Sequence, residues 1–441
     1  MAARRFGGLG RLAAAGGAVM SLMIMLTPGP ALAGTAPAVP QTASGSQRAA
    51  LDAGKLRATL DATHKAGMYG IYSSVRDDGR SWKGASGVAN VQTGWPVTPD
   101  MQHRVGSVTK TFTAAAVLRQ VEQGRIQLDA PIGAYLPEDV PGQRGRQITV
   151  RMLLNHTSGI ADYVASAFPS LQEPSSRSLD RKRFRTLTPA RLIKWGLDAP
   201  PTGAPGAQWS YSNTNYIILG RLLEKVTGMK AETYITRDVI RRAGLKNTYF
   251  PDSPVIYGAH SRMYESLYGV LTPPRDYSLF DMSWAGTAGA LVSTMDDLNR
   301  FYRRLLTGGI VGPAALAEMR RTVPVKGADG TVLMNYGLGI YSVQLPCGTF
   351  WGHDGAVWGA GTQTLTGEGG GRQISFGFNL MKYQQLNGEG RPMPHPIDNA
   401  MGAHMMEALC GAGTPPPNAR LAQRPVQPLP LQMLAPQEGG S

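Results

Sequence analysis

The sequence predicts an α/β protein in which a sheet built from both ends of the chain carries an inserted, largely helical domain. Strand-like segments occur near residues 69–90 and again from about 330 to 380. The stretch between them carries apolar residues at helical spacing. Strands and helices that are segregated in this way favour one α/β unit with an insertion over an alternating parallel sheet.

The first elements expected are an amphipathic helix over residues 48–66 and a β-hairpin over residues 69–90. The hairpin is predicted to turn at Asp78-Gly79, a dipeptide that is typical of two-residue hairpin loops. These two elements would form the N-terminal part of the sheet and one helix covering it.

Three helices are expected in the middle of the chain. Each has a small polar residue as a plausible N-cap or a glycine as its end, and these are the signals that bound helices. The segments are "KTFTAAAVLRQVEQG", ending at Gly124, "ITVRMLLNHTSG", from Thr149 to Gly159, and "NTNYIILGRLLEKVTG", from an Asn cap to Gly228.

Strands are expected to return in the last third of the chain, followed by a helix over about 396–409. The strand-like segments are "YGLGIYSV", "TFWGHDG", "GTQTLTG" and "RQISFGFNL". The run Gly367–Gly371 between the last two lacks the following helix and lysine of a phosphate-binding loop, so it predicts a hairpin turn.

Both ends of the chain are expected to lie outside the folded domain. Residues 1–33 have a basic start, an uncharged apolar segment and an Ala-x-Ala ending, which predicts a cleaved signal peptide and export. Residues 34–46 predict a flexible leader, and the Pro-rich stretch 411–441 predicts a disordered tail. The folded domain would then span 47–410, with its helical subdomain at about 110–285.

The net charge of +14 does not by itself indicate nucleic acid, because the basic residues are scattered and form no long block. It favours a weak affinity for anionic polymers of the cell envelope. The histidines outside the motifs show no metal-ligand spacing, so neither a metal nor another cofactor is expected. The two cysteines, Cys347 and Cys410, favour one disulfide in an exported protein over two free thiols.

Three short motifs carry the expected chemistry: Ser107-x-x-Lys110, Tyr211-Ser212-Asn213 and His353-Asp354-Gly355. Each alone is weak, because a Ser-x-x-Lys quartet arises roughly once by chance in a chain of this length. The first motif is also compatible with an ordinary helix start. Their order and settings are more specific: a helix N-terminus, a loop before a helix and a late strand.

The residue types suit nucleophilic catalysis. On a helix, Lys110 shares a face with Ser107 and can take its proton if burial depresses the lysine pKa. The Tyr211 hydroxyl can exchange protons with a leaving group, and Asn213 can orient Lys110 and a substrate amide. The Ser107 N–H with a strand N–H opposite would form an oxyanion hole.

These motifs, with "RVGSVTKTF", "LLNHTSGIADY", "SWAGTAGALVST", "YGLG" and "WGHDG", resemble serine D-alanyl-D-alanine carboxypeptidases and class C β-lactamase-like hydrolases over about 50–412. The resemblance implies a β-lactamase/transpeptidase-like fold, acylation of Ser107 and an oxyanion hole from Ser107 and Ala356. It also implies a hydrogen bond from His353 to Tyr211, pairing of the two cysteines, and a cleft lined by Trp284, Tyr163, Gly355 and Tyr341. His156 in "LLNHTSG" is interpreted as structural.

Two departures from the resemblance concern specificity. The third motif of the carboxypeptidases usually reads His-Thr-Gly-Thr, and its hydroxyls hold the terminal carboxylate of the substrate. Here Asp354 and Ala356 stand at those threonines, and Tyr341 stands where an arginine is expected. The groups that would bind a free carboxylate are therefore missing.

The sequence as a whole predicts an exported, monomeric serine hydrolase that resembles D-alanyl-D-alanine carboxypeptidases. It would act on small peptides, amides or esters, with β-lactams as covalent inhibitors and peptidoglycan as a further candidate partner. An esterase, D-amino-acid amidase or β-lactamase on the same scaffold is the first alternative. An inactive penicillin-binding module of the envelope is the second.

Overall fold

The computed structural model describes residues 50–173, 175–327, 330–388 and 390–411. The predicted signal peptide, flexible leader and tail beyond Gly411 lie outside these residues. Within the described ranges, no helix is both long and apolar enough to cross a membrane.

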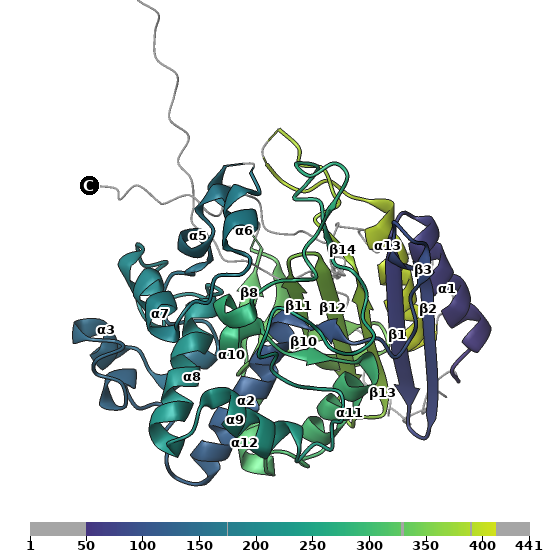
Figure 1. The fold of residues 1–441 in the computed structure, drawn as a ribbon. Coiled ribbons are helices and arrows are strands. Elements are labelled where there is room, and N and C mark those ends of the chain that lie inside the picture. The colour runs from purple at the N-terminus through teal and green to yellow at the C-terminus, as the bar shows by residue number, and fades with distance from the viewer. Residues whose placement is uncertain (1–49, 174, 328–329, 389, 412–441) are drawn as a thin grey trace, which may run out of the picture.

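A nine-stranded sheet forms the centre of the molecule, and all its neighbouring strands run antiparallel. N-terminal strands lie directly beside C-terminal ones in this sheet (Figure 1), which confirms the predicted α/β fold class. The strand order is β3 (Trp95–Pro96), β2 (Arg80–Asn90), β1 (Gly70–Asp77), β13 (Arg372–Phe378), β12 (Ala360–Gly367), β11 (Gly348–Val357), β10 (Tyr341–Leu345), β9 (Val332–Tyr336), β8 (Val323–Lys326).

Helices cover both faces of the sheet. The terminal helices α1 (Ala53–Lys65) and α13 (Pro396–Cys410) pack together on one face, where Leu60 and Met401 join strand residues such as Ile374 in one apolar core. On the opposite face, α11 (Met295–Leu306) is tied to the sheet by Asn299, whose amide donates to Ser74 O at 2.8 Å. Because both faces are covered, β12 and β13 are buried along their whole length.

The middle of the chain is mostly helical and lies on one side of the sheet (Figure 1). Its longest helices are α2 (Thr109–Glu122), buried along most of its length, and α8 (Asn213–Thr227). Shorter helices are α3 (Gly142–Gln147), α4 (Val150–Leu154), α5 (Val164–Ala167), α6 (Arg177–Lys182), α7 (Pro189–Asp198), α9 (Ala231–Ile235), α10 (Gly286–Gly289) and, after α11, α12 (Pro313–Met319). Two-residue strands form two small sheets: β14 (Leu380–Met381), β5 (Tyr264–Glu265), β6 (Arg275–Asp276), and β4 (His103–Arg104), β7 (Val292–Ser293).

The turns and the helix end that were expected at glycines are confirmed at three places. Asp77 pairs with Arg80, so Asp78-Gly79 is a two-residue hairpin loop, in which Asp78 has a φ of 52°. Helix α8 ends at Gly228, whose φ of 67° is the left-handed conformation that glycine adopts without steric cost. The run Gly367–Gly371 connects β12 to β13 as a turn.

The helix expected from Thr149 to Gly159 is much shorter than predicted. Thr149 does cap it, accepting from the Met152 N–H, but α4 ends at Leu154. The chain then leaves the helix because His156 adopts a left-handed φ of 62°, while the Asn155 side chain accepts from the Thr157 N–H. This early end carries His156 into the interior.

The predicted disulfide is confirmed: Cys347 and Cys410 are bonded, with their Cα atoms 5.4 Å apart. The bond attaches the end of α13 to the turn between β10 and β11. The bridge closes a loop with a sequence separation of 63 residues, which contributes about 4 kcal/mol in the chain-entropy model.

Reduction of this bond is expected to lower the melting temperature by several degrees while leaving covalent labelling by penicillin intact. Differential scanning calorimetry with and without reductant measures the shift, and a Cys347→Ser/Cys410→Ser variant provides the control. Equal melting temperatures for oxidised and reduced protein would contradict this expectation.

Candidate active site

Ser107 lies in a single 3-10 turn, η1 (Gly106–Val108), that leads directly into α2. Close backbone contact places this turn against β11. A Cβ atom at Gly106 would lie 2.5 Å from Ala356 N, and one at Gly355 would lie 2.9 Å from Ser107 N and 1.9 Å from Val105 O. Only glycine fits at either position, so two glycines let the backbone N–H groups of Ser107 and Ala356 approach one another.

Lys110 follows Ser107 by one helical turn and is completely buried. Its Nζ atom lies 3.1 Å from Ser107 Oγ, 2.7 Å from Asn213 Oδ1 and 2.7 Å from Ala288 O. Burial lowers the pKa of Lys110 to about 7, although the carboxylates of Asp162 and Asp354 act to raise it. A substantial fraction of the amine is therefore neutral at neutral pH and able to accept a proton.

Tyr211, in the segment just before α8, also contacts the Ser107 hydroxyl. Its hydroxyl donates to Ser107 Oγ at 2.7 Å, and its ring centre lies 4.8 Å from Lys110 Nζ. Burial raises the pKa of Tyr211 well above its ordinary value, so the phenol stays protonated. Ser107 Oγ thus contacts one group that can take a proton and one that can give a proton.

Asn213 is positioned by Asp162, a residue that the sequence analysis did not single out. The Asp162 carboxylate accepts from the backbone N–H of Asn213 at 2.9 Å and from its side-chain amide at 2.7 Å. The amide oxygen is thereby turned toward Lys110. The sequence predicted an asparagine as the N-cap of this helix. In the structure Ser212 precedes α8, and Asn213 is the first residue of the helix.

His353 makes different contacts from those that the resemblance implied. Its Nδ1 lies 2.6 Å from the Asp354 backbone oxygen and its Nε2 lies 2.9 Å from the Tyr336 hydroxyl, and no hydrogen bond joins it to Tyr211. Because a carbonyl oxygen only accepts, Nδ1 carries the proton and Nε2 accepts from Tyr336. Burial lowers the pKa of His353 to about 3, so the ring is neutral.

His156 fills the space between the tyrosines of the site, as its structural interpretation predicts. Its ring centre lies 4.3 Å from that of Tyr211 and 5.0 Å from that of Tyr336. Its Nδ1 accepts from the Ser212 N–H at 3.1 Å. The imidazole therefore supports the loop that carries Tyr211 and does not contact Ser107.

Three aromatic side chains pack together near Ala356, which is expected to contribute to the oxyanion hole. Trp284 stacks on Trp358 with ring centres 5.5 Å apart, and Phe168 packs edge-on against both. The Tyr163 hydroxyl donates to the Trp284 backbone oxygen. Tyr163, Trp284 and Trp358 are all almost fully buried. The role of Trp284 and Tyr163 in lining the cleft therefore stays a prediction, and Trp358, two residues after Ala356, was not singled out from the sequence.

Tyr341 and Asp354 lie in the interior next to His353. The Tyr341 ring centre is 5.5 Å from that of His353, and its hydroxyl accepts from Gln363 at 3.0 Å. Burial raises the pKa of Tyr341 well above its ordinary value, and the Asp354 carboxylate, which hydrogen-bonds the same tyrosine, raises it further. Both residues are almost fully buried, so neither presents a free cation or hydroxyl at the surface of the site.

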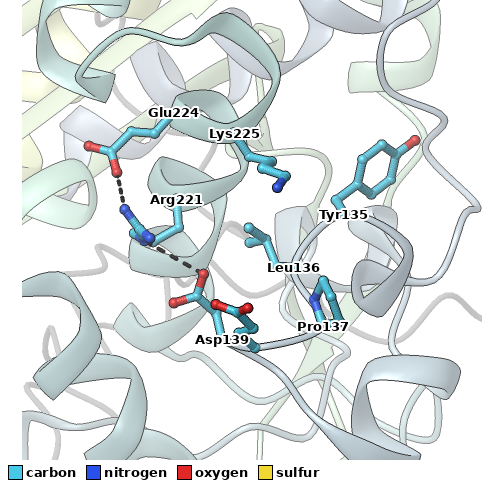
Figure 2. Close-up of a pocket in the computed structure, with 8 residues that line it drawn as sticks. Tyr135, Leu136, Pro137, Asp139, Arg221, Glu224 and Lys225 are labelled. Atoms are coloured by element: carbon cyan, nitrogen blue, oxygen red, sulfur yellow. Dashed lines mark hydrogen bonds and ion pairs between the residues drawn. The ribbon is translucent and has the colours of Figure 1, made fainter.

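A separate pocket of about 280 Å³ opens between the segment 135–139 and the later turns of α8. Figure 2 shows Arg221 held between Asp139 and Glu224. At 1.5 Å per residue, Arg221 is about 12 Å along the helix from Asn213. The lining of this pocket includes no serine, cysteine or histidine, and its arginine is already paired with two carboxylates.

The rate of acylation is expected to fall as the pH drops through about 7. The neutral Lys110 amine is the base, and each pH unit below its pKa of about 7 reduces the neutral fraction tenfold. By this relation, kcat/KM near pH 5 should be about one hundredth of the plateau value. A pH profile of acylation by a fluorescent penicillin measures it.

An Asp354→Asn variant serves as the matched control for this profile. The Asp354 carboxylate acts to raise the Lys110 pKa, so its removal should shift the acid limb to lower pH. His353 cannot produce a limb near 7, because its pKa is lowered to about 3. A profile that stays flat from pH 5 to 8 would exclude Lys110 as the base.

Comparison with known proteins shows strong similarities along most of the chain. A family model described as beta-lactamase matches residues 54–376. Penicillin-binding protein 4 of Amycolatopsis lactamdurans is 28% identical over 398 residues, covering 84% of this chain and 94% of that protein. The esterase EstB of Burkholderia gladioli is 31% identical over 211 residues, covering 45% of this chain and 53% of that protein.

A solved structure agrees in fold over the whole of its own length. The D-stereospecific amidohydrolase from a Streptomyces species is 32% identical and superposes with a TM-score of 0.71, covering 82% of this chain and 100% of that chain.

Proposed function

The chain is a serine hydrolase of the beta-lactamase family, and we propose that it hydrolyses D-amino-acyl amides or esters through an acyl-enzyme on Ser107. The observation that carries this proposal is the double contact of Ser107 Oγ, 3.1 Å from Lys110 Nζ and 2.7 Å from the Tyr211 hydroxyl. Such a hydroxyl can lose its proton and attack a carbonyl while a second group protonates the leaving group.

The proposed acylation moves one proton around this group. Neutral Lys110 takes the proton of Ser107 as Oγ bonds to the substrate carbonyl carbon. The N–H groups of Ser107 and Ala356 stabilise the oxyanion. Tyr211 then protonates the departing amine or alkoxide and recovers a proton from Lys110, and the carbon–nitrogen or carbon–oxygen bond breaks. Water attacks the ester in the second half, with the same groups acting in reverse.

The proposed preference for amides and esters over substrates with a free C-terminal carboxylate rests on three residues. A charge-assisted bond to a terminal carboxylate is worth roughly 1.5–3 kcal/mol, or one to two decades in rate. Ala356 has no hydroxyl for such a bond, and the Tyr341 hydroxyl is already engaged by Gln363. Asp354 adds a negative charge nearby. These features favour the amidase or esterase alternative over the carboxypeptidase that the sequence analysis preferred.

A matched pair of substrates tests this preference. An amidated or esterified D-Ala-D-Ala analogue should give a kcat/KM at least equal to that of the free acid. Asp354→Thr with Ala356→Thr should shift the preference toward the free acid, which makes this variant the control. A wild-type protein that favours the free acid tenfold or more would refute the proposed specificity.

The remaining parts of the proposal concern the setting of the enzyme. The N-terminal sequence supports export, and the proposal includes a monomer with β-lactams as covalent inhibitors and no nucleic-acid partner. The alternative, an inactive penicillin-binding module, would bind β-lactams without turning over any ester. The neutral Lys110 beside Ser107 favours the enzyme.

A further inference from the structure

A group of basic and apolar side chains lies at the surface around α6, all exposed except the half-buried Lys182 and Arg183, and the catalytic chemistry does not use it. We call it the α6 surface. It consists of the basic residues Arg177, Arg181, Lys182, Arg183, Arg185 and Arg191 and the exposed apolar residues Phe184, Val255, Tyr257 and Leu279. Figure 1 shows α6 beside α5 at one end of the helical part of the molecule.

The parts of this surface are held together by hydrogen bonds between segments. The Arg183 guanidinium donates to Leu279 O at 2.7 Å, and Arg183 O accepts from the Asp281 N–H at 2.7 Å. The Phe280 N–H donates to Pro254 O, which adds the segment that carries Val255 and Tyr257. The apolar and basic residues therefore belong to one patch.

The positive charge of the α6 surface is largely uncompensated. Among the described residues, none of its six basic side chains forms an ion pair with a carboxylate. The neighbouring acids Asp180 and Asp276 are paired with Arg275 and Arg262, which leaves Glu173, Asp252 and Asp281 near six cations. Arg185 and Arg191 also lower the pKa of Lys182, after its partial burial, as mutual repulsion requires.

The apolar residues of the patch protrude between these cations. Phe184 is 60% exposed between Arg183 and Arg185, and Tyr257 is 72% exposed. Val255 and Leu279 are 40% and 38% exposed. Aromatic and aliphatic side chains next to arginines are typical of proteins that lie on an anionic membrane, where the rings enter the interface and the cations meet the phosphates.

We propose that the α6 surface binds the interface of a membrane that contains anionic phospholipids. The cations alone would suit any polyanion, but the exposed rings have a use only where an apolar phase lies beneath the phosphates. The surface lies near Trp284, which is expected to line the cleft, because the Leu187 N–H donates to Ser283 Oγ, one residue before Trp284. Binding would hold the enzyme with this side toward the membrane.

Vesicle sedimentation of the purified full chain tests the proposal. The protein should sediment with phosphatidylcholine vesicles that contain phosphatidylglycerol and remain in solution with phosphatidylcholine alone. Arg181→Gln with Arg185→Gln should lower the partition coefficient about fivefold for each charge removed. Arg241→Gln with Arg242→Gln, at exposed positions outside this surface, is the matched control and should bind as the wild type does.

The apolar contribution is tested separately. Phe184→Ser with Tyr257→Ser should also reduce vesicle binding, whereas Trp95→Ser, at an exposed apolar residue on β3, should not. Unchanged penicillin labelling confirms that each variant is folded. Absence of binding to the anionic vesicles would overturn the proposal. So would full binding by the Phe184/Tyr257 variant together with displacement by soluble polyphosphate, which would indicate a polyanion site.

Discussion

Replacing Ser107 by alanine is expected to abolish both turnover and covalent labelling by penicillin. Every step of the proposed mechanism passes through Ser107 Oγ, which Lys110 and Tyr211 both contact. Loss of a nucleophile that acts as a unit with its base costs about 10⁴-fold or more in kcat. Ester hydrolysis, and gel fluorescence after treatment with a fluorescent penicillin, measure the two losses.

The control for this variant is a second serine-to-alanine change at Ser81, which lies on the exposed end of β2 away from the site. It should label and turn over as the wild type does. If the Ser107→Ala protein melts at the wild-type temperature and still forms the penicillin adduct, Ser107 is not the nucleophile.

Gly355→Ala is expected to reduce acylation about a hundredfold without removing any catalytic side chain. The new methyl group would lie 1.9 Å from Val105 O and 2.9 Å from Ser107 N, so the turn that carries Ser107 has to move. Displacing or losing one oxyanion-hole donor costs about 10²–10³ in kcat. Stopped-flow acylation gives the rate directly, and thermal melting reports any loss of stability.

Gly369→Ala is the matched control for this substitution. Gly369 lies in the β12–β13 turn and has open space where its Cβ would be. Acylation by this variant should be unchanged. Wild-type acylation rates in the Gly355→Ala protein would show that the close contact between η1 and β11 is not needed for catalysis.

The sequence predicted most of the fold because its signals are local. Asp78-Gly79 specifies a hairpin by itself, and Gly228 ends α8 through its left-handed conformation. Which strands pair with which was not predictable, because β1 lies beside β13 through contacts between residues about 300 positions apart. The early end of α4 was missed because His156 is drawn into a cluster of tyrosines that only the tertiary structure assembles.

The residues of the candidate site also differ in whether local sequence signals could predict them. The three motifs together indicated Ser107 and Lys110, and the three-residue spacing of this pair at a helix start brings the two side chains together. Asp162 gave no motif signal, although a lone acid in "LLNHTSGIADY" was available as a hint. The hydrogen-bond partner of His353 was predicted wrongly: it is Tyr336 and not Tyr211. Both tyrosines pack around His156 in the interior, and sequence spacing cannot say which of the two faces His353.

Rapid-quench mass spectrometry of the wild-type protein during hydrolysis of a D-alanyl ester tests the central claim most directly. The account predicts that a fraction of the protein gains the mass of the acyl group. Peptide mapping should place this group on Ser107, and the adduct should decay as fast as product forms. Turnover without any adduct on the millisecond scale, or an acyl group mapped to another residue, would contradict an acyl-enzyme on Ser107.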